Sequence, residues 1–439
     1  MRRGFIFNQK LCVNCKSCSA ACTMENGFNI KPRSVLSSNP EVSATLPLSY
    51  LSIACNHCEI AVCMNGCPAS AYNREQLSGA VLIDNNKCIG CKYCIWNCPY
   101  DAPKYDPVNR VIGKCHLCYS RLESGMMPAC AAGCPTGALS FGNIDDYDNS
   151  NQPVWFPGEE LNPALSFPVK PDDYPLRIIP DSLFKGIMSA KDHGKRSIES
   201  EWSLVIFSFL TALSVSIMAS SFIKGVLPDK LLFISISILP AVFSIFHLGK
   251  WERAWRAVTN IKGSPLSREI LIFVIYLIIS CYSVIYEMPF LIVSSSVIGF
   301  LLLIAIDTVY YYSVRTFSVF LHSGQTLLTS MLIVSFLSDS TVPFLFIAAI
   351  KIILSLRIIL QSRKNSIIGI LRFARLAFLL VAGASFISGI SYPGPAVLSL
   401  FIAGELIDRV LFYYDFEPPR LNVLMNNHPD YIEHEKERD

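Results

Sequence analysis

Hydrophobic and polar residues are divided unevenly along this chain, and the division predicts two structural regions. From Trp202 to Tyr414 the sequence is dominated by Leu, Ile, Val, Phe and Ser. A helix needs about 20 apolar residues to cross a bilayer, and eight runs approach that length: 202–223, 231–248, 270–286, 290–312, 317–337, 342–360, 373–390 and 394–414. The run at 317–337 is the weakest, because His322, Ser323, Gly324 and Gln325 dilute it. We therefore predict an all-α bundle of eight transmembrane helices.

The region before the apolar runs is more polar and holds sixteen of the 17 cysteines. We predict an α+β ferredoxin-like domain over residues 1–145, a proline-rich arm and linker over 146–201, the membrane anchor over 202–414 and a polar tail over 415–439. Seven prolines between Pro153 and Pro180 exclude long helices and central strands from the linker. It is either an extended arm lying over the domain or a disordered segment.

The cysteines fall into four groups, and each group ends in Cys-x3-Cys. The first and third have the spacing C-x2-C-x2-C-x3-C, by which two-cluster ferredoxins hold cubane iron–sulfur clusters. Three of the groups are followed directly by proline, which indicates a duplicated unit. The groups are Cys12, Cys15, Cys18 and Cys22; Cys55, Cys58, Cys63 and Cys67; Cys88, Cys91, Cys94 and Cys98; and Cys115, Cys118, Cys130 and Cys134.

Sixteen thiolates in this arrangement predict four [4Fe–4S] clusters. Structural zinc uses two C-x2-C pairs and has no need of a third cysteine two residues further on, so zinc remains an alternative for the fourth group alone. The ferredoxin motif sends its last cysteine to the neighbouring cluster, and we expect the same exchange here. Cys98 then completes the second group, Cys67 the third, Cys134 the first and Cys22 the fourth.

Composition and motifs argue against other functions for the polar region. The formal net charge of +3 and the absence of a basic tract with interleaved aromatics do not favour nucleic-acid binding. No nucleophile–base pair, phosphate-binding glycine loop or acid/base carboxylate pair stands beside the cysteines. The region is predicted to carry electrons without transforming a substrate.

Ionisable residues inside the apolar runs are costly, and we treat them as functional candidates. Asp307, Lys351 and Glu405 lie within runs, and His247 ends the second run. Oxidation of a quinol releases protons, so a histidine or carboxylate is expected at the quinol hydroxyl. The alternatives are an interfacial histidine at His247 and a structural ion pair for the other three. Only His247 and His322 could serve a haem, both near one edge, so no haem is predicted.

Several segments resemble the dimethyl sulfoxide reductase family. Leu51–Glu59, Cys88–Cys94 and Cys98–Pro103 are similar to its iron–sulfur electron-transfer subunit over residues 3–145. That resemblance implies a relay to a separate molybdopterin catalytic subunit. More faintly, His247–Gly249, Arg253–Ala257, Leu266–Ile270 and Gly404–Arg409 resemble the family's eight-helix anchor subunit, normally a separate chain.

Carried over to this sequence, the resemblance to the anchor subunit implies that His247 and Glu269 belong to a menaquinol site, with Arg256 beside them. Arg256 also has a simpler interpretation, which is docking of the soluble domain. The predicted function is the oxidation of menaquinol in anaerobic respiration, with electrons passing through the clusters to the catalytic partner. Two alternatives remain: a quinone-reducing subunit of a sulfur-compound-oxidising or polysulfide-reductase-like complex, and an ion-translocating module using Asp307, Lys351 and Glu405.

Basic residues predict the orientation in the cytoplasmic (inner) membrane. Loops on the cluster-domain side carry ten Lys or Arg, and the opposite loops carry only Lys224 and Lys230. The positive-inside rule then puts the cluster domain in the cytoplasm, although several of these bases lie in the motifs just named. The paired Arg2 and Arg3 lack an apolar segment behind them, so no signal peptide is expected.

Overall fold

The computed structural model describes residues 2–37, 50–147, 151–153, 156–157, 159–169, 201–314, 320–361, 366–388 and 394–416. The chain divides into two compact units: Met1–Lys195 with Pro418–Asp439, and Arg196–Glu417. Most of the predicted linker and nearly all of the predicted tail lie outside the described residues. The two units are described separately below.

The first unit is built around strand β1 (Arg3–Phe7). This strand pairs antiparallel with β8 (Leu139–Asn143) and parallel with β9 (Leu165–Ser166), so β1 lies in the centre of a three-stranded sheet. Phe5 and Phe7 point into the core because alternate residues of a strand share one face. The sheet thus joins the beginning and the end of the cysteine-rich region.

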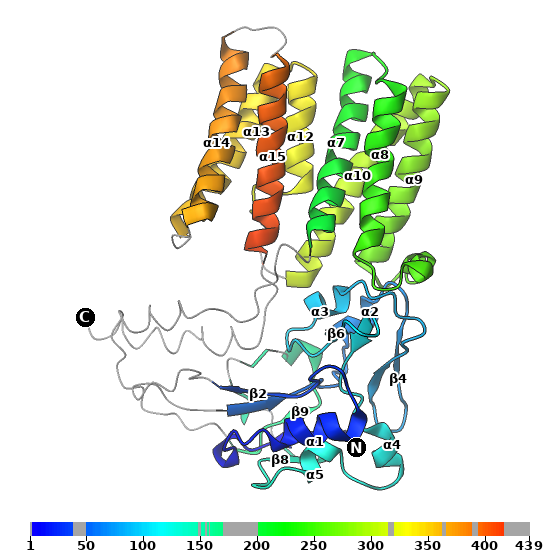
Figure 1. Cartoon of the computed structure of the whole chain (residues 1–439), viewed down its shortest axis with the longest axis vertical. Helices are drawn as coiled ribbons and strands as arrows, with labels where there is room; N and C mark the ends of the chain where they lie inside the picture. Colours follow the sequence, from blue (N-terminus) through cyan, green and yellow to red (C-terminus); the bar gives the residue numbers. More distant parts are fainter. Residues whose placement is uncertain are drawn as a thin grey trace, which may run out of the picture. The chain divides into compact units, whose positions relative to one another are not determined.

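Short hairpins and helices make up the rest of this α+β unit (Figure 1). The hairpins pair β2 (Ser34–Ser37) with β3 (Tyr50–Ile53), β4 (Tyr72–Arg74) with β5 (Val81–Ile83), and β6 (Lys104–Asp106) with β7 (Val111–Gly113). The helices are α1 (Ser17–Asn26), α2 (Val62–Asn65), α3 (Tyr93–Asn97), α4 (Tyr119–Glu123) and α5 (Ala129–Ala132), with 3-10 turns η1 (Gln9–Leu11) and η3 (Glu159–Leu161).

The beginning of the proline-rich arm packs into this unit. Phe156 and Phe167 are buried, and their rings meet edge to face at 5.4 Å. The Tyr100 hydroxyl donates to the Pro157 carbonyl at 2.7 Å, and β9 adds an edge strand to the sheet. The sequence did not predict this strand, because two residues are too few to produce an alternating pattern.

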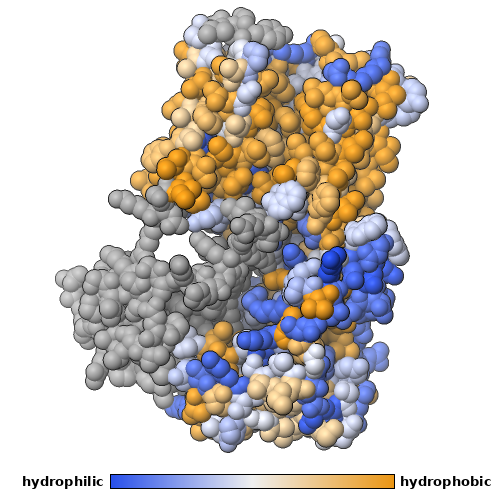
Figure 2. All heavy atoms as spheres, in the orientation of Figure 1, coloured by the Kyte–Doolittle hydropathy of each residue, from blue (hydrophilic) through white to orange (hydrophobic). Residues whose placement is uncertain are grey.

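The second unit contains eight α-helices in the stretches 201–314, 320–361, 366–388 and 394–416. In Figure 1, α7 to α10 form one group of adjacent helices and α12 to α15 another. The helices are α7 (Trp202–Lys224), α8 (Lys230–Phe246), α9 (Pro265–Ile285), α10 (Pro289–Val314), α12 (Thr326–Leu337), α13 (Thr341–Gln361), α14 (Ser366–Ile387) and α15 (Pro395–Asp415). Figure 2 shows hydrophobic side chains over most of the visible face of these helices.

Five of these helices are long and apolar enough to cross a membrane, which indicates a multi-pass membrane protein. A sixth span results if α8 is counted together with the 3-10 helix η5 (Trp251–Val258), which follows it at a bend of 108°. The run at 317–337 contains a helix of only 12 residues, α12, because the polar residues before Thr326 form turns. Helix α15 is not among the helices apolar enough to cross a membrane, because it contains several charged residues.

Buried serines explain how such apolar helices pack. Within a bilayer, small and hydroxyl-bearing residues allow close approach and hydrogen bonding between helices. Ser214 of α7 hydrogen-bonds Ser237 of α8 at 2.7 Å and Tyr276 of α9 at 2.9 Å. Ser216 of α7 and Ser330 of α12 lie 2.9 Å apart, which ties the two helix groups together.

Candidate iron–sulfur relay and membrane sites

The four cysteine groups begin with the same backbone turn. The residue before the second cysteine has a positive φ in every group: Asn14 at 55°, His57 at 45°, Gly90 at 69° and Leu117 at 63°. Such angles are uncommon outside glycine, so their recurrence is a shared structural feature. Successive backbone N–H groups in turns of this kind form concavities that bind anions and iron–sulfur centres.

The third cysteine of each group lies in a helix; the fourth lies beyond the end of that helix in three groups, whereas Cys22 of the first group is still inside α1. Cys94 is inside α3, whereas Cys98 is its C-cap, with extended backbone angles of −92° and 113°. The following Pro99 accounts for this conformation, because a residue before proline is excluded from the helical region. The side chain of Cys98 therefore leaves the face that Cys94 occupies.

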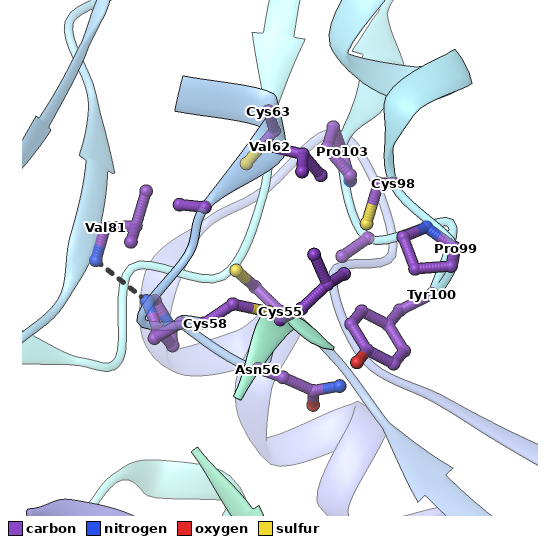
Figure 3. Close-up of a pocket in the computed structure, with 14 residues that line it drawn as sticks. Cys55, Asn56, Cys58, Val62, Cys63, Val81, Cys98, Pro99, Tyr100 and Pro103 are labelled. Carbon is purple, nitrogen blue, oxygen red and sulfur yellow. Dashed lines mark hydrogen bonds between the residues drawn. The ribbon is translucent and has the colours of Figure 1, made fainter. Parts of the chain in front are cut away.

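The departing cysteine reaches a neighbouring group. Cys98 joins Cys55, Cys58 and Cys63 around a cavity of about 360 Å³ (Figure 3). The labelled cysteines surround one space, which Pro103 and Tyr100 also line. We call this set of four cysteines site C.

A second cavity of about 300 Å³ has the corresponding composition. Cys12, Cys15 and Cys18 line it together with Cys134 from the far end of the domain, and we call this set site A. The antiparallel pairing of β1 with β8 brings these distant segments together. Cys134 therefore lies among cysteines of the first group.

The remaining cysteines gather into two further sets. Electrostatic interactions join Cys67 to Cys88, Cys91 and Cys94, which we call site D. They also join Cys22 to Cys115, Cys118 and Cys130, which we call site B. Within the described residues no three His, Cys, Asp or Glu side chains converge on a single metal ion. Sites A and C each enclose a cavity.

Burial disfavours the ionised form of these thiols. It raises the pKa of Cys22, Cys58 and Cys63 to about 12, with neighbouring cysteines adding to the effect. Metal centres bind thiolates, so filling the sites must displace protons. The sets therefore match soft, positively charged iron in a cluster, for which thiolate is the preferred ligand.

These loops and cavities define the class of protein as an iron–sulfur electron carrier joined to a helical membrane region. Residues 46–144 match the family model of a 4Fe-4S dicluster domain. The sequence is 36% identical over 154 residues to the B subunit of the anaerobic dimethyl sulfoxide reductase of Haemophilus influenzae, a match that spans 33% of this chain and 75% of that protein.

Two other relatives match the same region. Protein NrfC of Escherichia coli K12 is 35% identical over 150 residues, 33% of this chain and 67% of that protein. The thiosulfate reductase electron transfer subunit PhsB of Salmonella typhi is 34% identical over 146 residues, 32% of this chain and 76% of that protein. This protein belongs to the iron–sulfur electron-transfer subunits of the dimethyl sulfoxide reductase family. The resemblance of residues 3–145 to the electron-transfer subunit is thereby confirmed: the protein is a non-catalytic [4Fe–4S] subunit of an oxidoreductase complex.

The residues predicted for a quinol site lie on three elements that pack together in the helical unit. His247 is the C-cap of α8, Arg256 lies in η5, and Glu269 lies in the first turns of α9 and is 5% exposed. The Ser267 hydroxyl of α9 donates to the Ala257 carbonyl of η5 at 2.7 Å. This bond holds η5 against the start of α9.

Asp307 has a clear structural role. Its carboxylate accepts hydrogen bonds from the Thr326 N–H at 3.0 Å, the Thr326 hydroxyl at 2.6 Å and the Leu327 N–H at 3.1 Å. These are unsatisfied donors at the start of α12, where a negative charge is favourable. Asp307 therefore acts from α10 as the cap of α12.

Lys351 and Glu405, the other two predicted residues, form an ion pair inside the bundle. Lys351 is 0% exposed and also lies 3.0 Å from Asp408, which in turn pairs with Arg375 at 3.1 Å. The sequence interpretation had not included Asp408 and Arg375. Their signal was the spacing of Glu405 and Asp408 on one face of an otherwise apolar run. A polar cavity of about 260 Å³ adjoins this network, lined by His322, Ser323, Ser355, Arg372, Arg375, Asp408 and Asp415.

Arg409 links this region to the other helix group. It is 1% exposed, donates to the Ser208 hydroxyl at 2.7 Å and to the Gly324 carbonyl at 2.6 Å, and its guanidinium lies 4.4 Å from the Phe412 ring centre. Its positive charge acts on both Glu269 and Asp307. Two of the predicted membrane residues, Glu269 and Asp307, are thus connected electrostatically through a residue of α15.

Proposed function

We propose that this chain is the electron-transfer and membrane-anchor subunit of a menaquinol-linked molybdopterin oxidoreductase. Its helical unit oxidises quinol, and its cysteine-rich unit passes the electrons to a separate catalytic subunit in anaerobic respiration. The observation that carries this proposal is the gathering of sixteen cysteines into four sets within a chain that also carries an apolar helix bundle. Membership of the family supports the separate catalytic partner.

The cysteine-rich unit holds four [4Fe–4S] clusters, one at each of sites A to D, with the last cysteine exchanged between groups. The shared positive-φ turns and the two cavities support this assignment. Bound clusters would supply one-electron carriers, and the chain supplies the thiolates, their spacing and the shielding from water.

The sites follow one another in the order D, C, B, A. Tyr72 interacts with Cys94 of site D and with Cys63 of site C, which supports their adjacency. The Cys55 thiolate of site C acts on Cys115 of site B, and Cys18 of site A acts on Cys130 of site B. Sites D and A are therefore the two ends of the relay.

Quinol oxidation takes place where α8, η5 and α9 meet. His247 and Glu269 accept the protons released from the quinol hydroxyls, and Arg256 orients the ring. The burial of Glu269 beside the start of α9 supports a proton acceptor that is shielded from bulk water.

Metal analysis and quinol oxidation test the proposal together. The purified full chain should contain iron and acid-labile sulfide near sixteen each, since each of four cubane centres holds about four of both. Membranes supplied with an electron-accepting dye should oxidise a reduced menaquinone analogue and reduce the dye, and His247→Ala and Glu269→Gln should abolish this while leaving the iron content unchanged. An iron content near eight, or retained quinol oxidation in both variants, contradicts the proposal.

Electron flow in the opposite direction, towards quinone, is a related candidate. The likeness to PhsB, whose name describes a thiosulfate reductase subunit, connects this type of relay with sulfur compounds without setting the direction of electron flow. Reduction of added menaquinone by the complex with a sulfur compound as donor, faster than the reverse reaction, would favour this direction.

Ion translocation is a second candidate, favoured by the charged network around Lys351 and the polar cavity beside it. Lys351→Met tests it: a changed proton-to-electron ratio at unchanged turnover favours translocation, and an unchanged ratio makes the network structural. We also propose, from the excess of basic residues in the loops predicted on the cluster-domain side, that the cluster unit faces the cytoplasm. Labelling of engineered single cysteines in intact cells tests it, and a reagent that reaches residues 363–372 from outside contradicts it.

A further inference from the structure

Two buried cations lie among the cysteine sets without a carboxylate to balance them. Lys114 is 3% exposed and Arg33 is 2% exposed, and neither forms an ion pair with an Asp or Glu of the described residues. A buried charge without a counter-charge is costly. Its presence therefore needs a counter-charge that no Asp or Glu of the described residues provides.

Lys114 faces site C. Its Nζ lies 3.6 Å from the Cys55 Sγ and donates to the Cys115 carbonyl at 2.9 Å and to the Val81 carbonyl. Its ammonium therefore contacts a ligand sulfur directly, and it is fixed in place by two backbone oxygens.

Arg33 lies at the junction of sites A and B. Its Nη1 donates to the Ser52 hydroxyl at 3.1 Å, which lies 3.3 Å from the Cys18 Sγ, and its guanidinium stacks 4.3 Å from the Phe5 ring centre. Nε and Nη2 are buried and have no hydrogen-bond partner in the described part of the chain. Burial acts to lower the pKa of Arg33, but thiolates of site B, chiefly Cys130 and Cys115, outweigh it and raise that pKa.

The described residues include no further buried Lys or Arg for the end sites, and Arg33 acts on Cys18 of site A less strongly than on Cys130 and Cys115 of site B. The groups that act most strongly on Cys91 and Cys94 of site D are other cysteines, Tyr72 and backbone N–H groups. Those acting on Cys12 of site A are cysteines and a backbone N–H. Arg2 acts on Cys58 of site C, but it is nearer the surface and Glu59 and Asp145 act on it in turn.

A cluster held by four thiolates is anionic, and reduction adds one further negative charge. Net charge and hydrogen bonds to the sulfurs set the reduction potential of such centres, and a nearby cation favours the more negative form. We propose that Lys114 and Arg33 are redox-tuning residues that make the two inner sites, C and B, more easily reduced than the end sites, A and D.

This inference rests on the proposed four-cluster relay and assigns a function to its two inner sites. Oxidation of one quinol releases two electrons, and two easily reduced inner sites hold both of them at once. The end sites have lower reduction potentials, so electrons pass through them without remaining there. The quinol site is freed before the catalytic partner has taken either electron.

The test is a redox titration of the full-length chain followed by electron paramagnetic resonance, with iron and sulfide measured on the same samples. We expect Lys114→Met and Arg33→Met to lower different steps among the two most easily reduced, each by at least tenfold in the reduction equilibrium, or about 59 mV. The iron content should stay at the wild-type value. Lys104→Met is the matched control, because Lys104 lies in the same domain but is partly exposed and paired with Asp101.

The outcomes separate the tuning role from the relay itself. A wild-type iron content near eight contradicts the four-cluster proposal, whatever the variants do. Four intact clusters whose potentials do not move, or move only in the two least easily reduced steps, overturn the tuning role. If a methionine variant loses iron, Lys114→Gln and Arg33→Lys replace it. The tuning role is also overturned if Lys114→Gln loses iron. It is overturned as well if Arg33→Lys, which keeps the positive charge, lowers the reduction potential by as much as the expected tenfold change in the reduction equilibrium.

Discussion

Removal of Lys351 should destabilise the helical unit more than any other single change within its charged network. Lys351 pairs with Glu405 and with Asp408, and all three are almost fully buried. In Lys351→Met, Asp408 keeps Arg375 at 3.1 Å, but Glu405 has no second cation among its ion pairs in the described residues. Leaving one member of a buried pair alone costs about 3–5 kcal/mol.

The reciprocal change should be milder. In Glu405→Gln, Lys351 keeps Asp408 at 3.0 Å and the Thr329 hydroxyl at 2.9 Å, so its charge remains balanced. We expect the free energy of unfolding to fall by about 1–2 kcal/mol, because a charge-assisted hydrogen bond is lost. The double variant Lys351→Met/Glu405→Gln should cost less than Lys351→Met alone, because no buried charge is then left without a partner.

Unfolding in mixed detergent micelles, followed by circular dichroism, measures these differences. Lys230→Met is the matched control, because Lys230 pairs with Glu287 at the surface and a solvent-exposed pair adds little. Equal destabilisation by the two single variants, or a double variant that equals their sum, would refute the reasoning. In that case another group would balance the negative charge of Glu405.

Three further predictions concern single contacts. Asp307→Ala should cost about 1–3 kcal/mol in the same assay, because three donors at the start of α12 lose their acceptor; a neutral result would mean that water replaces the carboxylate. Cys134→Ser should alter the electron paramagnetic resonance signal of one cluster, and Cys22→Ser that of another, since these residues lie in sites A and B. Loss of the same signal in both variants contradicts the exchange of the last cysteine between groups. Burial acts to raise the pKa of Asp106, but hydrogen bonds from Asn109, Asn29 and Val108 outweigh it and lower that pKa. The stabilisation by Asp106 should therefore be complete above its unfolded pKa, about 3.9, and be lost as the pH falls through the lower pKa of the folded state. If the wild-type chain remains more stable to unfolding than Asp106→Asn in acid, the prediction is contradicted.

The sequence predicted most where function depends on local spacing. The cysteine groups and the departure of Cys98 before Pro99 follow from residues that are neighbours in the chain. The likeness of the four turns at Asn14, His57, Gly90 and Leu117 was not predicted, because only one of the four residues is glycine.

The sequence predicted less where helices meet. Hydropathy identified Lys351 and Glu405 as costly residues, but it did not reveal that Asp408 and Arg375 complete one network with them. Which faces of α13, α14 and α15 meet depends on side-chain packing between helices, and near-uniform hydrophobicity carries little information about it. The same limit applies to Asp307, whose partner is the end of another helix 19 residues away along the chain.

Buried cations are balanced differently in the two units, and this difference is itself evidence about what the first unit binds. In the helical unit Lys351, Arg372 and Arg375 each pair with a carboxylate within the bundle, and Arg409 acts on two. In the cysteine-rich unit Lys114 and Arg33 meet sulfur, hydroxyl and carbonyl groups instead. Neutral thiols at those places would leave two positive charges buried at a cost of several kcal/mol each. Thiolates bound to iron would remove that cost, so these cations mark where anionic clusters are needed for the fold as well as for electron transfer.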